Sequence, residues 1–437
     1  MAAIKAGAAT AVITPPAGLD LSGWSFGPSR GVHDDLYAKV LVLDDGTGPA
    51  VVITADLIGL GTGYADRFRK ETAAKLNTVP GRILFSCSHT HSGPGAMKLR
   101  RWGSVDEEYL FTALEKIQTA VLEAYGKMKE CRIASAAGMV RGICDNRRDD
   151  RRKAVDESLP VVRIEGKDGT PLAALFNYSC HPVAAHNDRN LISADYPGFA
   201  RRVLEKELGC PVTLFTLGAC GDVNPKEFHR IELAEHYGGE IGKAAAEVWR
   251  SMDSAAEDIS IIIKTERISL PVRDLPSAVE LEEEIVTREK EAAELERRGL
   301  PHKREDALIK LEWAREALET VRSGTARDRM EMEVGVLAIG DTAMVTLPGE
   351  LFSEIGMNIK SRSPFRTTII SELTNGSFCY IPTASAFDRG GYETDFSAKV
   401  YGLYMLTRDA QEIVENAAER LLRSAADQKK NQDLEEK

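Results

Sequence analysis

The sequence predicts a large α/β domain, and two observations lead to this fold class. Short runs rich in Val, Ile and Leu are separated by Gly, Pro and Asp, and they alternate with longer stretches in which apolar residues recur at helical intervals. The chain is also long enough, at 437 residues with 43% hydrophobic residues, to bury a large core. We therefore expect one domain over residues 1–425.

The first part of the chain contains four expected strands and one expected helix. The strands fall at residues 10–14, 37–43, 49–56 and 82–85, which are short apolar runs bounded by turn residues. A helix is expected to follow Ser104, because Ser104 to Glu107 have the spacing of a capping box and apolar residues then recur every three or four positions.

The remainder of the domain alternates strands with helices. The expected helices cover residues 197–208, 229–252 and 397–425. The expected strands follow the same apolar, β-branched pattern at 131–136, 160–164, 172–178, 211–217, 258–269, 331–339, 342–347 and 367–373. A charged, polar tail over residues 426–437 is expected to be disordered.

A segment of different composition covers residues 277–323. It is dense in Glu, Lys, Arg, Ala and Leu, and it is interrupted at residues 298–301, where Gly and Pro occur. Narrow apolar seams with charged flanks predict two antiparallel helices, that is, a helical hairpin. Three roles remain open for it: a solvated excursion from the domain, a lid, or an arm through which copies of the chain form a homo-oligomer.

Composition excludes several classes of partner. Lys and Arg number 56 against 67 Asp and Glu, so the net charge is −11, and no basic block could track a nucleic acid backbone. The N-terminus lacks the apolar core of a signal peptide, and no apolar run approaches the about 20 residues of a transmembrane helix. The seven scattered cysteines are typical of reduced thiols. We expect a cytoplasmic protein that acts on a small molecule.

Two histidines follow the strand at residues 82–85. Side chains alternate along an extended backbone, so His89 and His91 project to the same side if strand geometry persists through Thr90. Two imidazoles on one side can share a metal, and the Gly-Pro-Gly that follows at residues 93–95 lets the backbone turn around it. The structural alternative is a hydrogen-bonded pair inside the core.

Three further side chains stand at comparable strand ends. They are His181, Glu350 and Tyr380, and each has an alternative as a core histidine, a helix N-terminal charge or a buried aromatic. Together with His89 they supply two nitrogen and two oxygen ligands, a set that suits Zn²⁺. A thiolate site is a further alternative, because cysteines lie beside these motifs, but free cysteines in strands commonly pack as small hydrophobes. These cysteines are Cys87, Cys180, Cys220 and Cys379.

These motifs resemble the catalytic domain of the neutral (non-lysosomal) ceramidases, which are zinc-dependent amidases. HTHSGPG at residues 89–95 is similar to the specific motif of that family, and CHP at 180–182, PGE at 348–350 and the loop at 375–381 resemble others. GDVNP at 221–225 resembles the family's GDVSP. The resemblance runs from about residue 5 to 425 apart from the hairpin, and it implies a large mixed-sheet catalytic domain with the hairpin inserted.

The resemblance also implies roles for individual residues. It implies that His89, His181, Glu350 and Tyr380 are the zinc ligands. His91 is expected near the metal-bound water rather than on the metal. Arg147, in an Asn-Arg pair like that of the family, is expected near the scissile carbonyl.

Two features depart from the family pattern. Asn224 stands where the family has a serine that takes part in amide cleavage. The sequence also has no counterpart of the family's immunoglobulin-like carboxyl-terminal domain. With no serine at this position, zinc-activated water is the expected attacking group.

The reaction that these residues predict is hydrolysis of an N-acyl amide. We expect His91 to transfer the proton, Arg147 to stabilise the oxyanion, and the Asn224 amide to donate a hydrogen bond to the oxyanion or to a substrate hydroxyl. One alternative keeps the zinc site but acts on an ester or on a polar, sugar-derived substrate. A second alternative is a non-catalytic, metal-containing binder.

Overall fold

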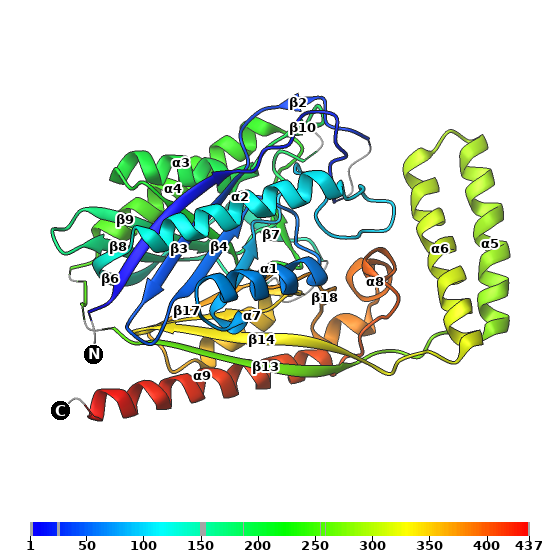
Figure 1. The fold of residues 1–437 in the computed structure, drawn as a ribbon. Coiled ribbons are helices and arrows are strands. Elements are labelled where there is room, and N and C mark those ends of the chain that lie inside the picture. Colours follow the sequence, from blue (N-terminus) through cyan, green and yellow to red (C-terminus); the bar gives the residue numbers. More distant parts are fainter. Residues whose placement is uncertain are drawn as a thin grey trace.

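The computed structural model describes residues 3–23, 27–148, 154–186, 188–253, 255–257 and 259–435. Two β-sheets face each other at its centre, and helices cover their outer faces (Figure 1). The larger, eight-stranded sheet has the strand order β11 (Thr213–Leu217), β9 (Pro171–Tyr178), β8 (Ser158–Gly166), β6 (Lys129–Met139), β1 (Lys5–Val12), β3 (Tyr37–Asp44), β4 (Ala50–Ala55) and β5 (Ile83–Cys87).

The smaller sheet has four strands and lies against the inner face of the larger one. Its strand order is β13 (Ile261–Pro271), β14 (Arg329–Ile339), β15 (Thr342–Thr346) and β17 (Thr367–Ser371). Apolar side chains from both sheets form one buried layer between them, which includes Leu41, Leu84, Ile164, Leu214, Leu337 and Ile369. Burial of this layer on both sides explains why the strands read as nearly continuous apolar runs.

Helices complete a four-layer arrangement (Figure 1). The outer face of the large sheet is covered by α1 (Thr62–Lys75), α2 (Glu107–Gly126), α3 (Asp195–Leu208) and α4 (Ile231–Arg250). The outer face of the small sheet is covered by α7 (Ser353–Arg362) and α9 (Ala410–Glu435). The predicted α/β class with a large mixed sheet is therefore confirmed, since both sheets combine parallel and antiparallel pairs.

The predicted helices and strands differ from the structure in the first part of the chain. Helix α1 was not predicted, because its 14 residues are mostly polar and bury only one side. The N-cap of α2 is Asp106 and not Ser104, because the Asp106 carboxylate accepts a hydrogen bond from Tyr109 N at 2.8 Å. Strand β1 begins at Lys5, and a Cβ at Gly7 would lie 2.0 Å from Ala124 O of α2, so only glycine permits this close packing.

The end of the chain also differs from the prediction. The single helix expected at 397–425 is instead two helices, α8 (Ser397–Tyr401) and α9, separated by irregular residues 402–409. Helix α9 continues through residues 426–435, where the sequence predicted disorder, and Lys429 Nζ there donates to Asp341 Oδ1 at 2.8 Å. The last two residues of the predicted tail lie outside the described residues.

The segment at 277–323 forms two antiparallel helices that project from the body of the molecule (Figure 1). These are α5 (Ala278–Arg297), which starts at a capping box between Ser277 and Glu280, and α6 (Pro301–Ser323). Helix α6 contacts the body, where Trp313 Nε1 donates to Leu403 O at 2.7 Å. Among the helices that the structure describes, none is both long and apolar enough to cross a membrane.

Candidate metal centre

The ends of three strands meet at the centre of the molecule. The segment that leaves β17 runs between β5 and β11: Cys87 N of β5 donates to Leu373 O at 3.2 Å, and Glu372 N donates to Leu217 O of β11 at 3.0 Å. The large sheet is curled, because β11 approaches β5 although the two stand at opposite ends of its strand order. Loops that leave β5, β9 and β17 therefore converge on one place.

Four of the predicted site residues come together there. His89 follows β5 and His181 follows β9, while Glu350 begins β16 (Glu350–Leu351) and Tyr380 begins β18 (Tyr380–Ile381). Strands β16 and β18 pair in parallel with Glu350 opposite Tyr380, so the pairing sets these two side chains beside each other. All four residues are buried.

The loop that carries the two histidines does not continue the strand. Strand β5 ends at Cys87, and His89 has φ of 67°, so the predicted extended geometry through Thr90 is wrong. The turn is anchored instead by hydrogen bonds: His89 N donates to Leu57 O at 2.9 Å, and Thr90 Oγ1 donates to Ser193 O at 2.7 Å. The predicted proximity of the histidines still holds, with 3.2 Å between His89 Nε2 and His91 Nε2.

Ring nitrogens and oxygens face one another across a small space. Glu350 Oε2 lies 3.5 Å from His89 Nε2 and 3.2 Å from His181 Nε2. The hydroxyl of Tyr380 lies 3.3 Å from His181 Nε2. Within the described part of the chain, Glu350 Oε2 is fully buried and accepts no hydrogen bond. A buried carboxylate oxygen in that condition is strongly unfavourable unless a cation binds it, so this donor set fits a metal.

Both candidate histidine ligands are held in the tautomer that a metal requires. His89 Nδ1 donates to Ile58 O at 2.5 Å, and His181 Nδ1 donates to Cys220 O at 2.8 Å. Because a carbonyl oxygen can only accept, each Nδ1 carries the proton and each Nε2 presents its lone pair to the centre. Hydrogen bonds of this kind orient the ligand rings of metal sites.

His91 is an alternative third imidazole ligand. The ligand atoms of His89, His91 and His181 lie within 4.8 Å of one another, close enough to hold one ion. His91 Nδ1 donates to Gly23 O at 2.8 Å, which fixes its Nε2 toward the same space. Its side chain is partly exposed, whereas the other two imidazoles are buried. His91 therefore differs from His89 and His181 in that its side chain is partly open to solvent.

The surroundings favour a neutral imidazole at His181 and His91 and a charged carboxylate at Glu350. Burial lowers the pKa of His181 to about 4, and burial together with the neighbouring imidazoles holds the pKa of His91 well below its usual value. At Glu350 burial opposes the charge, whereas a proton carried by His89 or His181 favours it and holds the pKa well below the usual range, and a bound cation would act in the same direction. Neutral imidazoles and an ionised carboxylate are the forms that bind metals.

Tyr380 is the ligand candidate whose surroundings oppose ionisation. Burial and the charge of Glu350 raise the pKa of Tyr380 well above its ordinary value. A divalent cation within bonding distance would act in the opposite direction, because it stabilises the phenolate. Tyr380 is therefore expected to be a neutral phenol without an ion and to ionise as an oxygen ligand when a cation binds.

Arg147 and Asn224 lie together beside this centre. Asn224 belongs to β12 (Val223–Pro225), which pairs with β7 (Cys144–Asn146) directly before Arg147. The guanidinium of Arg147 lies 5.6 Å from the ring centre of Tyr380 and donates to Asn224 Oδ1 at 3.2 Å and to Gly221 O at 2.7 Å. Since arginine only donates, Asn224 presents its carbonyl oxygen to Arg147 and keeps its amide N–H groups for another partner.

Two polar contacts of the site come from residues that the sequence analysis missed. Glu393 Oε1 accepts a hydrogen bond from Arg147 Nε at 3.0 Å, and the Tyr401 hydroxyl donates to Glu350 Oε1. Glu393 lies in a π-helical turn at Tyr392–Phe396 that was not predicted, and Tyr401 ends α8, within the helix expected at 397–425. The available signal for Glu393 was its place between Tyr392 and Phe396 in the sequence GGYETDF, and that pattern is weak.

The cysteines beside the motifs are not part of the cluster. Cys87, Cys180, Cys220 and Cys379 are buried, and burial raises the pKa of each thiol, to about 12 for Cys379. No cysteine joins the group of described residues that could hold an ion. They pack as small hydrophobic side chains, and the thiolate alternative is wrong for this centre.

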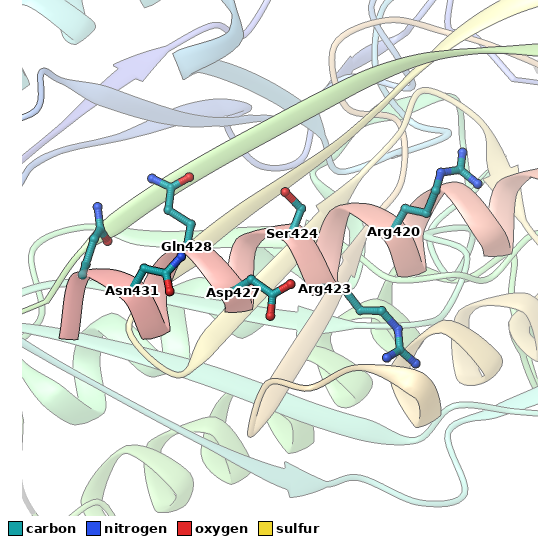
Figure 2. Close-up of a pocket in the computed structure, with 7 residues that line it drawn as sticks. Arg420, Arg423, Ser424, Asp427, Gln428 and Asn431 are labelled. Atoms are coloured by element: carbon teal, nitrogen blue, oxygen red, sulfur yellow. The ribbon is translucent and has the colours of Figure 1, made fainter. Parts of the chain in front are cut away.

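A hollow elsewhere on the molecule contains no histidine or cysteine that could bind a metal. It runs along one stripe of α9 and is lined by Arg420, Arg423, Ser424, Asp427, Gln428, Asn431 and Gln432 (Figure 2). These side chains recur every three or four residues on an exposed helix surface, and none is a histidine or a cysteine. The buried histidine cluster is therefore the better candidate site.

The chain is similar in sequence to curated neutral ceramidases, although no protein-family model matches it. It is 27% identical over 168 residues to neutral ceramidase B of Dictyostelium discoideum, which is 33% of this chain and 23% of that protein. It is 24% identical over 256 residues to the neutral ceramidase of Drosophila melanogaster, 51% of this chain and 36% of that protein. The alignments thus span about a quarter to a third of these relatives.

Solved structures extend the similarity to the whole fold. The crystal structure of neutral ceramidase from Pseudomonas aeruginosa superimposes with a TM-score of 0.73 and 16% identity, over 97% of this chain and 75% of that one. A structure of ceramidase complexed with C2 gives 0.73 and 15%, over 98% and 76%. The chain therefore shares the fold of these ceramidase structures.

Proposed function

We propose that the chain is a zinc-dependent hydrolase that cleaves an N-acyl amide bond, with residues 1–425 as its catalytic domain and His89, His181, Glu350 and Tyr380 as metal ligands. The observation that carries this proposal is the buried Oε2 of Glu350, which accepts no hydrogen bond from the described residues and faces two imidazole nitrogens. Relatives named ceramidases support an amide as the bond that is cleaved.

Zinc at this centre would polarise the scissile carbonyl and lower the pKa of a water molecule towards ~7. His91 then serves as the general base, because its Nε2 faces the centre and its Nδ1 is held by Gly23 O at 2.8 Å. Its lowered pKa keeps the imidazole neutral and ready to accept a proton from the attacking water. The same imidazole delivers that proton to the departing amine nitrogen.

Arg147 and Asn224 stabilise the negative charge that develops on the carbonyl oxygen. Arg147 keeps its positive charge although its side chain is largely buried, because Tyr380 and Glu393 outweigh the effect of burial and raise its pKa. Asn224 contributes an N–H donor, since its oxygen is already engaged by Arg147. An amide is no nucleophile, so Asn224 at the position of the family serine favours water as the attacking group.

Aromatic and charged side chains lie next to each other beside the centre. Tyr392 lies 5.5 Å from Tyr380 between ring centres, and Trp102 and Phe396 pack against Tyr392. The guanidinium of Arg147 lies 5.8 Å from the ring centre of Tyr392, and Arg147 and Arg148 both donate to Glu393. The aromatic rings suit an apolar acyl chain. The charged groups suit a polar head group, which supports a polar, sugar-derived substrate as the second candidate.

A hydrolysis screen tests this function. The purified protein is assayed against N-acyl amides that include ceramide, matched esters and N-acylated amino sugars, before and after treatment with a chelator and after zinc is added back. We expect the highest turnover with an N-acyl amide, loss of that turnover with the chelator, and recovery with zinc. Faster cleavage of the matched esters, or turnover that the chelator leaves unchanged, would contradict the proposal.

A further inference from the structure

We propose that residues 392–401 contain two positioning residues, Tyr401 for the metal ligand Glu350 and Glu393 for the substrate-facing Arg147. This segment joins a π-helical turn (Tyr392–Phe396) to α8 (Ser397–Tyr401), and we call it the positioning segment. The inference rests on the proposed function for the identity of the metal ligand. It assigns to one short stretch the orientation of both halves of the site.

Tyr401 controls how Glu350 presents its carboxylate. The Tyr401 hydroxyl donates to Glu350 Oε1, while Oε2 of the same carboxylate faces His89 and His181. Glu350 is completely buried, so no solvent replaces this hydrogen bond. With Oε1 engaged, the carboxylate cannot rotate without losing a buried hydrogen bond, and Oε2 is the oxygen left for the ion.

Glu393 controls the direction of Arg147. Its side chain is 5% exposed, and Oε1 accepts from Arg147 Nε at 3.0 Å while Oε2 accepts from Arg148. Gly221 O and Asn224 Oδ1 accept from the other two nitrogens of Arg147. The guanidinium is thereby fixed 5.6 and 5.8 Å from the ring centres of Tyr380 and Tyr392. A buried, charge-assisted contact of this kind sets geometry as well as charge.

The helical hairpin and a neighbouring loop support the positioning segment from outside. Ile309 of α6 is fully buried and packs in one cluster with Val400 of the segment. Arg100 Nε donates to Lys399 O at 2.9 Å, and Trp313 Nε1 of α6 donates to Leu403 O just beyond the segment. The segment therefore lies between the metal centre and the hairpin, which gives the hairpin a supporting role for the site.

Substitution of Tyr401 with Phe tests the first half of the inference. It removes the hydroxyl and keeps the ring, which lies edge-on to Tyr380 at 6.2 Å. We expect zinc affinity to fall about 10- to 100-fold, as for other groups that orient metal ligands. Affinity is measured on the full chain by competition with a chromogenic chelator, so the result does not depend on catalytic activity.

Tyr404→Phe is the matched control for this substitution. Its hydroxyl accepts from Arg327 N at 3.0 Å, away from the centre, so zinc affinity should stay that of the wild type. Equal affinity in Tyr401→Phe and Tyr404→Phe would overturn the role of Tyr401. A wild-type chain that binds no zinc would instead refute the proposed function, which keeps the two failures distinct.

Substitution of Glu393 with Gln tests the second half. It keeps the shape of the side chain and removes the charge that holds Arg147. We expect kcat on the best substrate of the screen to fall roughly 10- to 100-fold, because a misplaced catalytic group has an effect of that size, with zinc affinity unchanged. Unchanged kcat, or a parallel loss of zinc, would overturn the role of Glu393. If this variant does not fold, Glu393→Asp is judged by the same two measurements.

Discussion

The two halves of the candidate site are built in different ways. The metal half consists of His89, His181, Glu350 and Tyr380, which are buried and stand where strands end or pair. The Arg147 half is held by side-chain contacts nearer to solvent, and the Arg147 side chain is 24% exposed against 1% for His89.

This difference indicates what each half can tolerate. The metal half is set by the ends of β5 and β9 and by the pairing of β16 with β18, so loss of one ligand should not be compensated. The Arg147 half depends on side chains near solvent, and it is also where Asn224 departs from the serine of the family motif. We expect the metal half to determine the chemistry and the Arg147 half to determine rate and choice of substrate.

The largest effect should come from His181→Ala in the metal half. A three-ligand remnant loses a bond and its geometry, so most of the zinc and nearly all turnover should be lost. Elemental analysis and the hydrolysis assay measure both. His236→Ala is the control, because that imidazole is 61% exposed on α4 and pairs with Glu240. Full zinc content in His181→Ala would remove His181 from the ligand set.

His91→Ala should have the next largest effect, and it should separate loss of turnover from loss of zinc. The variant should keep its zinc and lose about 10² to 10⁴ in kcat, the usual contribution of a proton-transfer group. Zinc content and kcat are measured on the same preparation. Loss of zinc as complete as in His89→Ala would make His91 a ligand, and the cluster of three histidines would then be the metal site.

Asn224→Ala should act on turnover alone. Loss of one donor to an oxyanion lowers kcat by about 10² to 10³, and no ligand is changed, so zinc content should stay that of the wild type. Asn224→Ser, which restores the family residue, is the informative companion. Turnover in Asn224→Ala equal to that of the wild type would exclude Asn224 from the mechanism.

The smallest effect concerns stability and pH, through Asp222 between the two halves. Burial raises the pKa of Asp222 to about 6 from its ordinary value of 3.8, so the folded state binds more protons than the unfolded state between these values. Stability should therefore fall as pH rises from 4 to 6, by at most about 3 kcal/mol.

Denaturant unfolding of the wild type and of Asp222→Asn over this pH range measures the contribution of Asp222. The Asn variant does not titrate, so the wild type should lose stability relative to it as pH rises. A flat or rising difference would mean that the hydrogen bonds donated by Ser353 N and Asn146 Nδ2, both 2.7 Å long, keep the carboxylate ionised.

The sequence was most informative about site residues that lie at the ends or beginnings of strands. His89, His181, Glu350 and Tyr380 each follow or begin a strand, so a local pattern of apolar residues followed by a polar one was enough to select them. The α/β class was predicted in the same way, because short apolar runs typical of strands alternate with longer stretches in which apolar residues recur at helical intervals.

Long-range contacts account for what the sequence analysis missed. Glu393 and Tyr401 reach the site only because the positioning segment folds back onto it. Tyr401 is 51 residues from Glu350 along the chain, and Glu393 is 246 residues from Arg147. The left-handed backbone at His89 was also invisible, since its anchors Leu57 O and Ser193 O lie on other loops.

Anomalous diffraction at the zinc absorption edge, from crystals of the protein as purified, tests the central claim most directly. We predict one peak per chain, about 2.0 to 2.1 Å from His89 Nε2 and His181 Nε2 and about 2.0 to 2.2 Å from Glu350 Oε2 and the Tyr380 hydroxyl, with His91 unbonded. A peak bonded to His91 in place of an oxygen ligand, or no peak at this centre, would contradict the account.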